Sequence, residues 1–166
     1  MEVMCVYSSP LGRILLTGED GALTGLRFEG QRHSPPEGAY PPGDLPVFGE
    51  TARWLDVYFR GGIPDFTPAL KLKGTPFQRR VWEILRTIPY GETVTYGEIA
   101  RRIAGEKGTE KMSARAVGGA AGRNPVALIV PCHRVVGADG SMTGYAGGTE
   151  RKIRLLQMER ETLGRR

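Results

Sequence analysis

The chain has 166 residues, of which 40% are hydrophobic and 25% charged, a balance typical of a globular protein with one domain or two small ones. Its two cysteines, Cys5 and Cys132, can form neither a disulfide framework nor, by themselves, a four-sulfur zinc site, which favours a reducing cytoplasmic setting. No apolar run approaches the roughly 20 residues that cross a bilayer, and the acidic start is unlike a signal peptide, so we expect neither membrane insertion nor secretion.

The net charge of +5 is unevenly distributed along the chain. Residues 1–74 carry 7 Lys and Arg against 9 Asp and Glu, whereas residues 75–166 carry 16 against 9. The second half is therefore strongly basic. A polyanion such as nucleic acid is the partner that this half favours, although a solvated basic face has the same composition.

The first half predicts a small sheet followed by one helix. Three short strand-like runs are separated by turn signals, a pattern typical of an antiparallel meander. The runs are residues 2–8, 13–17 and 23–28. Residues 29–46 are rich in Pro and Gly, which indicates an exposed loop. From residue 47 to 60 apolar side chains recur at helical spacing, and Gly61-Gly62 ends the predicted helix.

The pattern changes to helices at Thr75. Thr75-Pro76-Phe77-Gln78 is a capping box with proline at the first helical position, and its apolar face continues to Ile88. We therefore expect an α/β protein of the α+β type. Its small N-terminal antiparallel-sheet domain spans residues 1–74, and a mainly helical C-terminal domain spans residues 75–166.

Two further short helices outline a helix-turn-helix, a motif that binds DNA. Thr95-Tyr96-Gly97-Glu98 is a second capping box, and its helix is expected to end at Gly105. Ser113 caps the next helix, residues 114–121, which carries Arg115. Pairs of short capped helices also occur in folds that do not bind DNA, so the pattern alone leaves this motif open.

The last part of the chain predicts a buried strand, a hairpin and a helix. Residues 126–130 form an unbroken apolar run with β-branched members, which favours a buried strand. Ala138-Asp139-Gly140 lies between two short runs, 135–136 and 141–143, and predicts a turn or a hairpin. The last helix is expected to be capped by Thr149, to extend from Glu150 to about Thr162, and to turn Ile153, Leu155 and Leu156 inward.

Cys132 lies between Pro131 and His133, where the predicted buried segment gives way to a loop. A lone cysteine is more often an inert buried residue than a nucleophile. An imidazole beside it can take the thiol proton, and a bridging water is the easier geometry because adjacent residues in an extended chain point to opposite sides. A carboxylate is needed to orient the imidazole, and both Glu159 and Glu98 are candidates.

Two motifs around this cysteine are highly specific: Pro131-Cys132-His133-Arg134 and, after it, Gly144-Tyr145-Ala146-Gly147-Gly148. With them, residues 75–160 closely resemble the catalytic domain of the O6-alkylguanine-DNA alkyltransferases, which repair DNA by direct reversal. Residues 1–74 resemble the family only in outline. The other matching stretches are Arg115-Ala116-Val117-Gly118, Asn124-Pro125, Ile129-Val130, Val135-Val136, Lys152, Leu155-Leu156 and Glu159.

The resemblance implies a catalytic role for four residues. Cys132 accepts the alkyl group, and His133, working through a water and oriented by Glu159, generates its thiolate. Tyr96 donates a hydrogen bond or proton to the departing guanine. A nucleophile at one end and a donor at the other are what this displacement requires. The thioether product resists water, so we expect each molecule to repair one lesion without a cofactor.

The resemblance also implies the residues that hold the base and the DNA. Asn124 holds the active-site turn, and the guanine pocket is lined by Val135, Tyr145 and Ala146, with positive charge from Lys152. Arg115 enters the base stack in place of the flipped nucleotide. The other expected DNA contacts are Ala116, Gly118, Gly119, Arg123, Thr95 and Arg134. The implied partner is double-stranded DNA containing O6-alkylguanine, bound through its minor groove by a monomer, at the nucleoid or in a nucleus.

Two features depart from the family pattern. The linker of residues 105–112 is several residues longer than usual, which leaves the placement of Arg115 relative to Tyr96 open. Some family members hold zinc in the first domain with two cysteines and two histidines. Here only Cys5 and His33 are available in that half, so we predict no structural metal.

Two other functions remain as alternatives. The first is a protein that binds alkylated bases without repairing them, although such proteins lack the acceptor cysteine that is present here as Cys132. The second is a cysteine hydrolase that uses Cys132 and His133. Such enzymes bring their base from a distant part of the chain, which argues against an adjacent pair.

Overall fold

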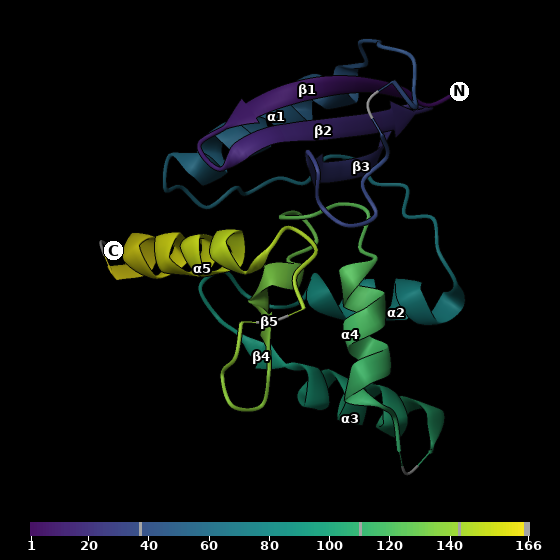
Figure 1. Cartoon of the computed structure of the whole chain (residues 1–166), viewed down its shortest axis with the longest axis vertical. Coiled ribbons are helices and arrows are strands. Elements are labelled where there is room, and N and C mark those ends of the chain that lie inside the picture. The colour runs from purple at the N-terminus through teal and green to yellow at the C-terminus, as the bar shows by residue number, and fades with distance from the viewer. Residues whose placement is uncertain (37, 110, 143, 165–166) are drawn as a thin grey trace.

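The structure is a computed structural model that describes residues 1–36, 38–109, 111–142 and 144–164. In Figure 1 a sheet lies at the top of the view and three helices of the second half at the bottom, with the C-terminal helix between them. This arrangement confirms the expected α+β class.

The first half forms the predicted meander with one helix packed against it (Figure 1). Its elements are β1 (Val3–Ser9), β2 (Gly12–Glu19), β3 (Ala22–Phe28) and α1 (Pro46–Phe59). The strands are antiparallel in the order β1-β2-β3, with a register shift between Thr17 and Gly18. The helix buries the stripe that its sequence predicted, which includes Trp54, Leu55 and Tyr58.

The described residues of the second half form four α-helices and two very short strands, besides a short 3₁₀ turn. They are α2 (Pro76–Leu85), β4 (Val94–Thr95), α3 (Tyr96–Lys107), α4 (Ala114–Gly122), β5 (Val135–Val136) and α5 (Thr149–Gly164). The caps predicted at Thr75, Thr95 and Ser113 are all present, because each side-chain oxygen accepts a hydrogen bond from the main-chain N–H three residues later.

Three local predictions are corrected by the structure. Helix α3 passes Gly105 and ends at Lys107, because Gly108, with a φ of +68°, provides the left-handed cap. The signal at residues 138–140 forms the expected turn, in which Gly140 N–H donates to the Gly137 carbonyl at 2.8 Å. Residues 141–142 do not form the second strand of a hairpin, since β5 pairs in parallel with β4 instead, and Thr143 lies outside the described residues. On α5 the side chain of Ile153 is 38% exposed rather than turned inward.

The apolar run of residues 126–130 is buried as expected, but it is a turn and not a strand. Two of its main-chain bonds close the turn within the run, Val130 N–H to the Val126 carbonyl at 3.1 Å and Ile129 N–H to the Ala127 carbonyl at 2.8 Å, and Leu128 has a φ of +70°. Only Val126 forms a bridge, and its partner is Leu26 on the edge of the sheet.

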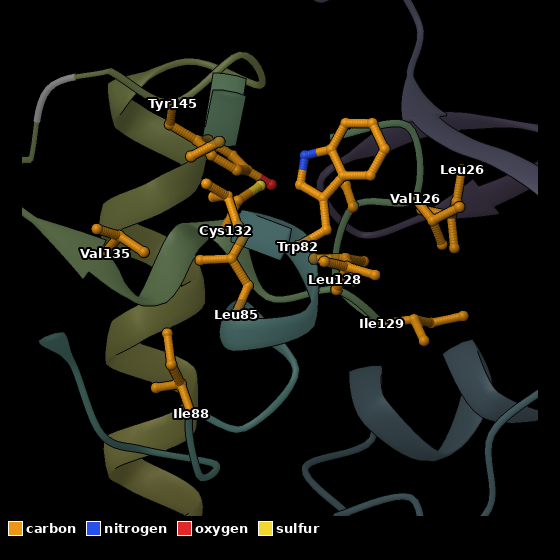
Figure 2. Close-up of a cluster of buried hydrophobic side chains, with 14 of the residues drawn as sticks. Leu26, Trp82, Leu85, Ile88, Val126, Leu128, Ile129, Cys132, Val135 and Tyr145 are labelled. Carbon is orange, nitrogen blue, oxygen red and sulfur yellow. The ribbon is translucent and has the colours of Figure 1, made fainter. Parts of the chain in front are cut away.

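The edge of β3 holds this turn in place. Leu26 N–H donates to the Pro125 carbonyl at 2.8 Å, and Ala127 N–H donates to the Leu26 carbonyl at 2.9 Å. Figure 2 shows the side chains of Leu26 and Val126 beside one another in the same buried cluster that contains Cys132. The two halves therefore share one core, and a domain boundary at residue 74 stays a prediction.

The capping box at Thr75 gives a first test of the fold. Replacing Thr75 with alanine removes the oxygen that accepts from Gln78 N–H at 3.1 Å, so we expect the free energy of unfolding to fall by about 1 kcal/mol. Urea unfolding followed by circular dichroism measures this loss. Thr67 is exposed and outside the helices, and Thr67→Ala should change the free energy by less than about 0.5 kcal/mol. Equal losses in both variants would contradict the cap.

Candidate active site

Cys132 begins a short 3₁₀ turn, Cys132–Arg134, and only 7% of its surface is exposed. Asn124 closes the preceding turn, as predicted. Its Nδ2 donates to the Val130 carbonyl at 2.7 Å and to Cys132 Sγ at 3.3 Å, while its Oδ1 accepts from Val126 N–H at 3.0 Å. One amide side chain therefore fixes both the turn and the sulfur.

The structure selects Glu159 as the carboxylate that orients His133. Atom Nε2 of His133 lies 2.6 Å from Oε2 of Glu159, and both side chains are fully buried. The other candidate, Glu98, is exposed and completes the cap of α3 by accepting from Thr95 N–H. Thr95 itself, expected at the DNA, is the residue that caps this helix.

Burial sets the protonation states of Cys132 and His133. Burial raises the pKa of the Cys132 thiol, against the opposing effects of the Asn124 hydrogen bond and the Lys152 charge. Burial also lowers the pKa of His133, although the hydrogen bond and charge of Glu159 oppose it. Both groups are therefore neutral at neutral pH, and the thiol needs a base when it reacts.

The hydrogen bond to Glu159 also fixes the tautomer of His133. Because Glu159 is ionised, Nε2 must carry the proton that joins the two side chains, so Nδ1 is left as an acceptor. Within the part of the chain that the structure describes, Nδ1 is buried without a hydrogen-bond partner. A buried acceptor of this kind is suited to a water that links it to the thiol.

The Glu159 carboxylate is surrounded by donors. Oε1 accepts from Gly91 N–H and from Arg134 Nε, both at 2.9 Å, and Oε2 accepts from His133 and from Tyr58. Burial by itself would raise the pKa of Glu159, but the hydrogen bonds and charges of His133 and Arg134 outweigh it and bring the pKa to about 2. The group is a permanent buried anion.

Arg134 was expected at the DNA, and the structure corrects this assignment. Its side chain is only 8% exposed, and it donates to Glu159 and, from Nη1, to the Ile88 carbonyl at 2.8 Å. A buried carboxylate needs a paired cation. The arginine of the Pro131–Arg134 motif therefore supplies internal charge balance instead of a phosphate contact.

Tyr96 lies beside the cysteine turn because β4, which precedes it, pairs with β5, which follows that turn. Burial and then the charge of a Cys132 thiolate raise the pKa of Tyr96, so its hydroxyl remains a donor. A Cβ on Gly144, whose φ is +87°, would lie 2.8 Å from the Tyr96 hydroxyl. Only glycine permits this close approach.

The residues expected to line the guanine pocket are brought together, but several are already engaged. Lys152 is buried, its Nζ donates to the Val135 carbonyl, and burial lowers its pKa to about 8. The Ala146 carbonyl accepts from Arg32 N–H at 3.3 Å. The hydroxyl of Tyr145, in contrast, is buried without a hydrogen-bond partner among the described residues. Figure 2 shows Tyr145 next to Cys132.

A cavity of about 760 Å³ opens at the face of α4, over Tyr96 and Gly144. Arg115, Gly118, Gly119 and Arg123 of the predicted DNA-binding set line it, whereas Ala116 lies exposed outside it and Cys132 is not part of its wall. Because Gly118 and Gly119 have no side chains, the backbone of α4 itself forms part of the cavity wall.

Sequence reasoning missed three residues of this region, all from the first half. Arg32 and His33 line the cavity, and reduced solvent contact followed by the charges of Arg123 and Arg32 lowers the pKa of His33. Tyr58 of α1 donates to Glu159. Two adjacent basic residues in a Pro- and Gly-rich loop were the only signal for the first pair, and Tyr58 was assigned to the apolar stripe of its helix.

Among the residues that the structure describes, no group of three or more His, Cys, Asp and Glu side chains is arranged to hold a metal ion. None of the helices that these residues form is both long and apolar enough to cross a membrane.

Two segments match the domains of one known family. Residues 76–161 match the "6-O-methylguanine DNA methyltransferase, DNA binding domain", and residues 3–72 match the "6-O-methylguanine DNA methyltransferase, ribonuclease-like domain". Relatives named "Methylated-DNA--protein-cysteine methyltransferase" include one from Mycobacterium leprae, 47% identical over 92% of this chain and 88% of its own length. Another relative of this name, from Haemophilus influenzae, is 42% identical over 93% of this chain and 84% of its own length.

Solved structures agree with these matches. The crystal structure of the Mycobacterium tuberculosis O6-methylguanine methyltransferase gives a TM-score of 0.84 at 45% identity, over 98% of this chain and 94% of that one. The crystal structure of Mycobacterium tuberculosis OGT in complex with DNA gives a TM-score of 0.83 at 45% identity, over 95% of this chain and 92% of that one. With both halves matched in sequence and in structure, the chain belongs to the 6-O-methylguanine DNA methyltransferase family.

Proposed function

We propose that this protein repairs O6-alkylguanine in double-stranded DNA by transferring the alkyl group irreversibly to Cys132. The observation that carries the proposal is the buried series Cys132, His133 and Glu159, in which a neutral thiol adjoins a neutral imidazole whose tautomer is fixed. A cavity lined by Arg32, Arg115 and Arg123 includes Tyr96 in its wall, and the pairing of β4 with β5 places Tyr96 beside the turn that carries the thiol. Membership of the family supports the same reaction.

The reaction is a single displacement. Sulfur of Cys132 attacks the alkyl carbon, a carbon–sulfur bond forms, and the bond between that carbon and guanine O6 breaks with its electron pair on the base. The thiol proton passes through a water to Nδ1 of His133, and Glu159 stabilises the imidazolium without taking the proton. Tyr96 donates a hydrogen bond or proton to the departing guanine anion. The base gains one proton in all, which balances the proton lost by the thiol, and ordinary guanine remains in the DNA.

The charges of the site support each step. Lys152 lies near both partners, with its Nζ 5.6 Å from the centre of the Tyr96 ring, and its positive charge favours the Cys132 thiolate. The pKa of Tyr96 is raised by burial and by a thiolate at Cys132, so the phenol keeps its proton until the base leaves. The site thereby separates the Cys132 thiol, which loses its proton before attack, from the Tyr96 phenol, which keeps its proton for the leaving base.

The face of α4 supports DNA as the partner. Arg115 and Arg123 are exposed on it, and Arg32 and His33 border the same cavity from the first half. We infer that α4 enters the minor groove, that the damaged nucleotide rotates out into the cavity, and that Arg115 fills the gap in the stack. A monomer has every group named here, and it would act in the compartment that holds the DNA.

The central test is the mass of the protein after reaction. Incubation with duplex DNA containing O6-methylguanine should add one methyl group to the peptide that bears Cys132, with one transfer per molecule, and Cys132→Ser should gain none. Intact and peptide mass spectrometry measure both results. Cys5 is an internal control, because burial and the charge of Asp44 raise its pKa to about 11 and make it unreactive.

Each other outcome of that experiment identifies a different function. Methylation of Cys5, or of no residue, contradicts the proposal. Tight binding of the lesion with an unmodified thiol would indicate a protein that recognises alkylated bases only. Catalytic turnover of an ester or amide that is lost in Cys132→Ser would indicate a hydrolase.

The role of Arg115 can be tested separately from chemistry. Base rotation costs a few kcal/mol in a duplex but nothing for a free base, so Arg115→Ala should slow repair of duplex DNA by about ten-fold or more. The rate with free O6-benzylguanine should stay within about two-fold of the wild type. Arg79→Ala, an exposed arginine on α2 outside the cavity, is the matched control. Equal losses on both substrates would contradict insertion into the stack.

A further inference from the structure

We propose that Tyr58, which α1 contributes from the first half of the chain, is a positioning residue for alkyl transfer that acts through the Glu159 carboxylate. The inference rests on the proposed function of Cys132. It extends the active site beyond the Pro131–Arg134 motif to a helix more than seventy residues earlier, and it gives the first half of the chain a direct part in the reaction.

The geometry places the Tyr58 hydroxyl at the oxygen that controls His133. Tyr58 Oη donates to Oε2 of Glu159 at 2.6 Å, and the same Oε2 lies 2.6 Å from Nε2 of His133. Tyr58 Oη is itself 3.4 Å from that nitrogen. The two donors therefore converge on one carboxylate oxygen and fix the direction in which it faces the imidazole.

The phenol is held rigidly and keeps its proton. Its ring stacks on Trp54 at 5.3 Å between centroids with 9° between planes, and its edge meets Phe59 and Tyr90. Burial and then the Glu159 charge raise the pKa of Tyr58 well above its usual range. Because the phenol does not ionise, its hydroxyl always donates to the carboxylate.

Tyr58 is an uncharged hydrogen-bond donor to Oε2 of Glu159, in addition to His133. Arg134 contacts both oxygens of Glu159, with Nε at 2.9 Å from Oε1 and Nη2 at 3.2 Å from Oε2, and Gly91 N–H contacts Oε1. Without the hydroxyl, Oε2 would have more negative charge available for His133. It would therefore stabilise the imidazolium more, while the carboxylate, with one donor fewer, would be held less rigidly toward the imidazole.

The pKa of His133 sets the pH below which the rate of alkyl transfer falls. His133 is a base only when neutral, so activity falls as pH drops through its pKa, and a raised pKa moves that fall to higher pH. Tyr58→Phe should therefore raise the pKa of His133 and move the fall in activity to higher pH. The titratable and charged groups around His133 are Glu159 and Lys152 on α5, Cys132 and Arg134 on its own turn, Tyr58 on α1, and Tyr145.

The experiment compares two tyrosines of the full chain that hydrogen-bond to carboxylates. Tyr7 Oη donates to Asp56 Oδ1 at 2.5 Å, at the other side of α1, so Tyr7→Phe removes the same group without touching Glu159. The rate of methyl gain at Cys132 is measured from pH 5 to 9 with O6-methylguanine duplex. Tyr58→Phe should be about ten-fold slower, with the acid limb raised by about half a unit to one unit. Tyr7→Phe should match the wild type.

A double variant tests whether Tyr58 acts through Glu159. In the Glu159→Gln background, Tyr58→Phe should slow transfer by less than about two-fold, because the group it positions is gone. An equal ten-fold loss in both backgrounds would overturn the proposal, as would a Tyr58→Phe profile identical to that of Tyr7→Phe. If the wild type gains no methyl group, the proposed function fails instead, so the two failures are distinguishable.

Two measurements separate positioning from folding. Thermal unfolding of both Phe variants gives the temperature at which each is fully folded, and rates are compared below it. Nitrogen-15 NMR of the imidazoles reports the tautomer directly, and only His33 and His133 contribute, so His33→Gln assigns the signals. The wild type should hold His133 with the proton on Nε2, and in Tyr58→Phe the nitrogen signals of His133 should titrate to the imidazolium at higher pH. A His133 titration identical to that of Tyr7→Phe would overturn the proposal.

Discussion

The active site depends on one buried anion, the carboxylate of Glu159. A carboxylate loses several kcal/mol of hydration when it is buried, and it stays ionised only if its oxygens are well supplied with donors. Here N–H and O–H groups of α1, of the loop after α2 and of the cysteine turn all point at it. Loss of any one of these donors would change the negative charge that the Glu159 carboxylate presents to His133.

In the proposed reaction, burial keeps the cysteine unreactive until substrate arrives, and this anion acts only on the base, His133. Burial keeps the Cys132 thiol neutral, so its sulfur is a poor nucleophile in the resting protein. The fixed imidazole and the nearby Lys152 lower the cost of ionisation at the moment of attack. Such an arrangement suits a protein that can react only once, because premature loss of the thiol would inactivate it for good.

Part of the site was predictable from the sequence. His133 was found because it adjoins Cys132, and Asn124 and Tyr96 were found because their surroundings resemble the alkyltransferase family. What the sequence could not provide were the contacts across long separations. Arg134 was expected at the DNA because its buried partner was unknown, and Tyr58 read as one more apolar position. The strand expected at residues 126–130 failed because unbroken apolar composition reports burial and not backbone direction.

The pairing of Leu26 with the turn at Pro125 and Ala127 bears on how small such a repair protein can be made. A polypeptide trimmed to its basic, helical part would keep every group that reacts. It would still lose both main-chain bonds that the sheet edge gives to that turn, as well as the phenol that reaches the buried anion. Miniaturisation would therefore have to replace the discarded strands with another rigid backbone edge.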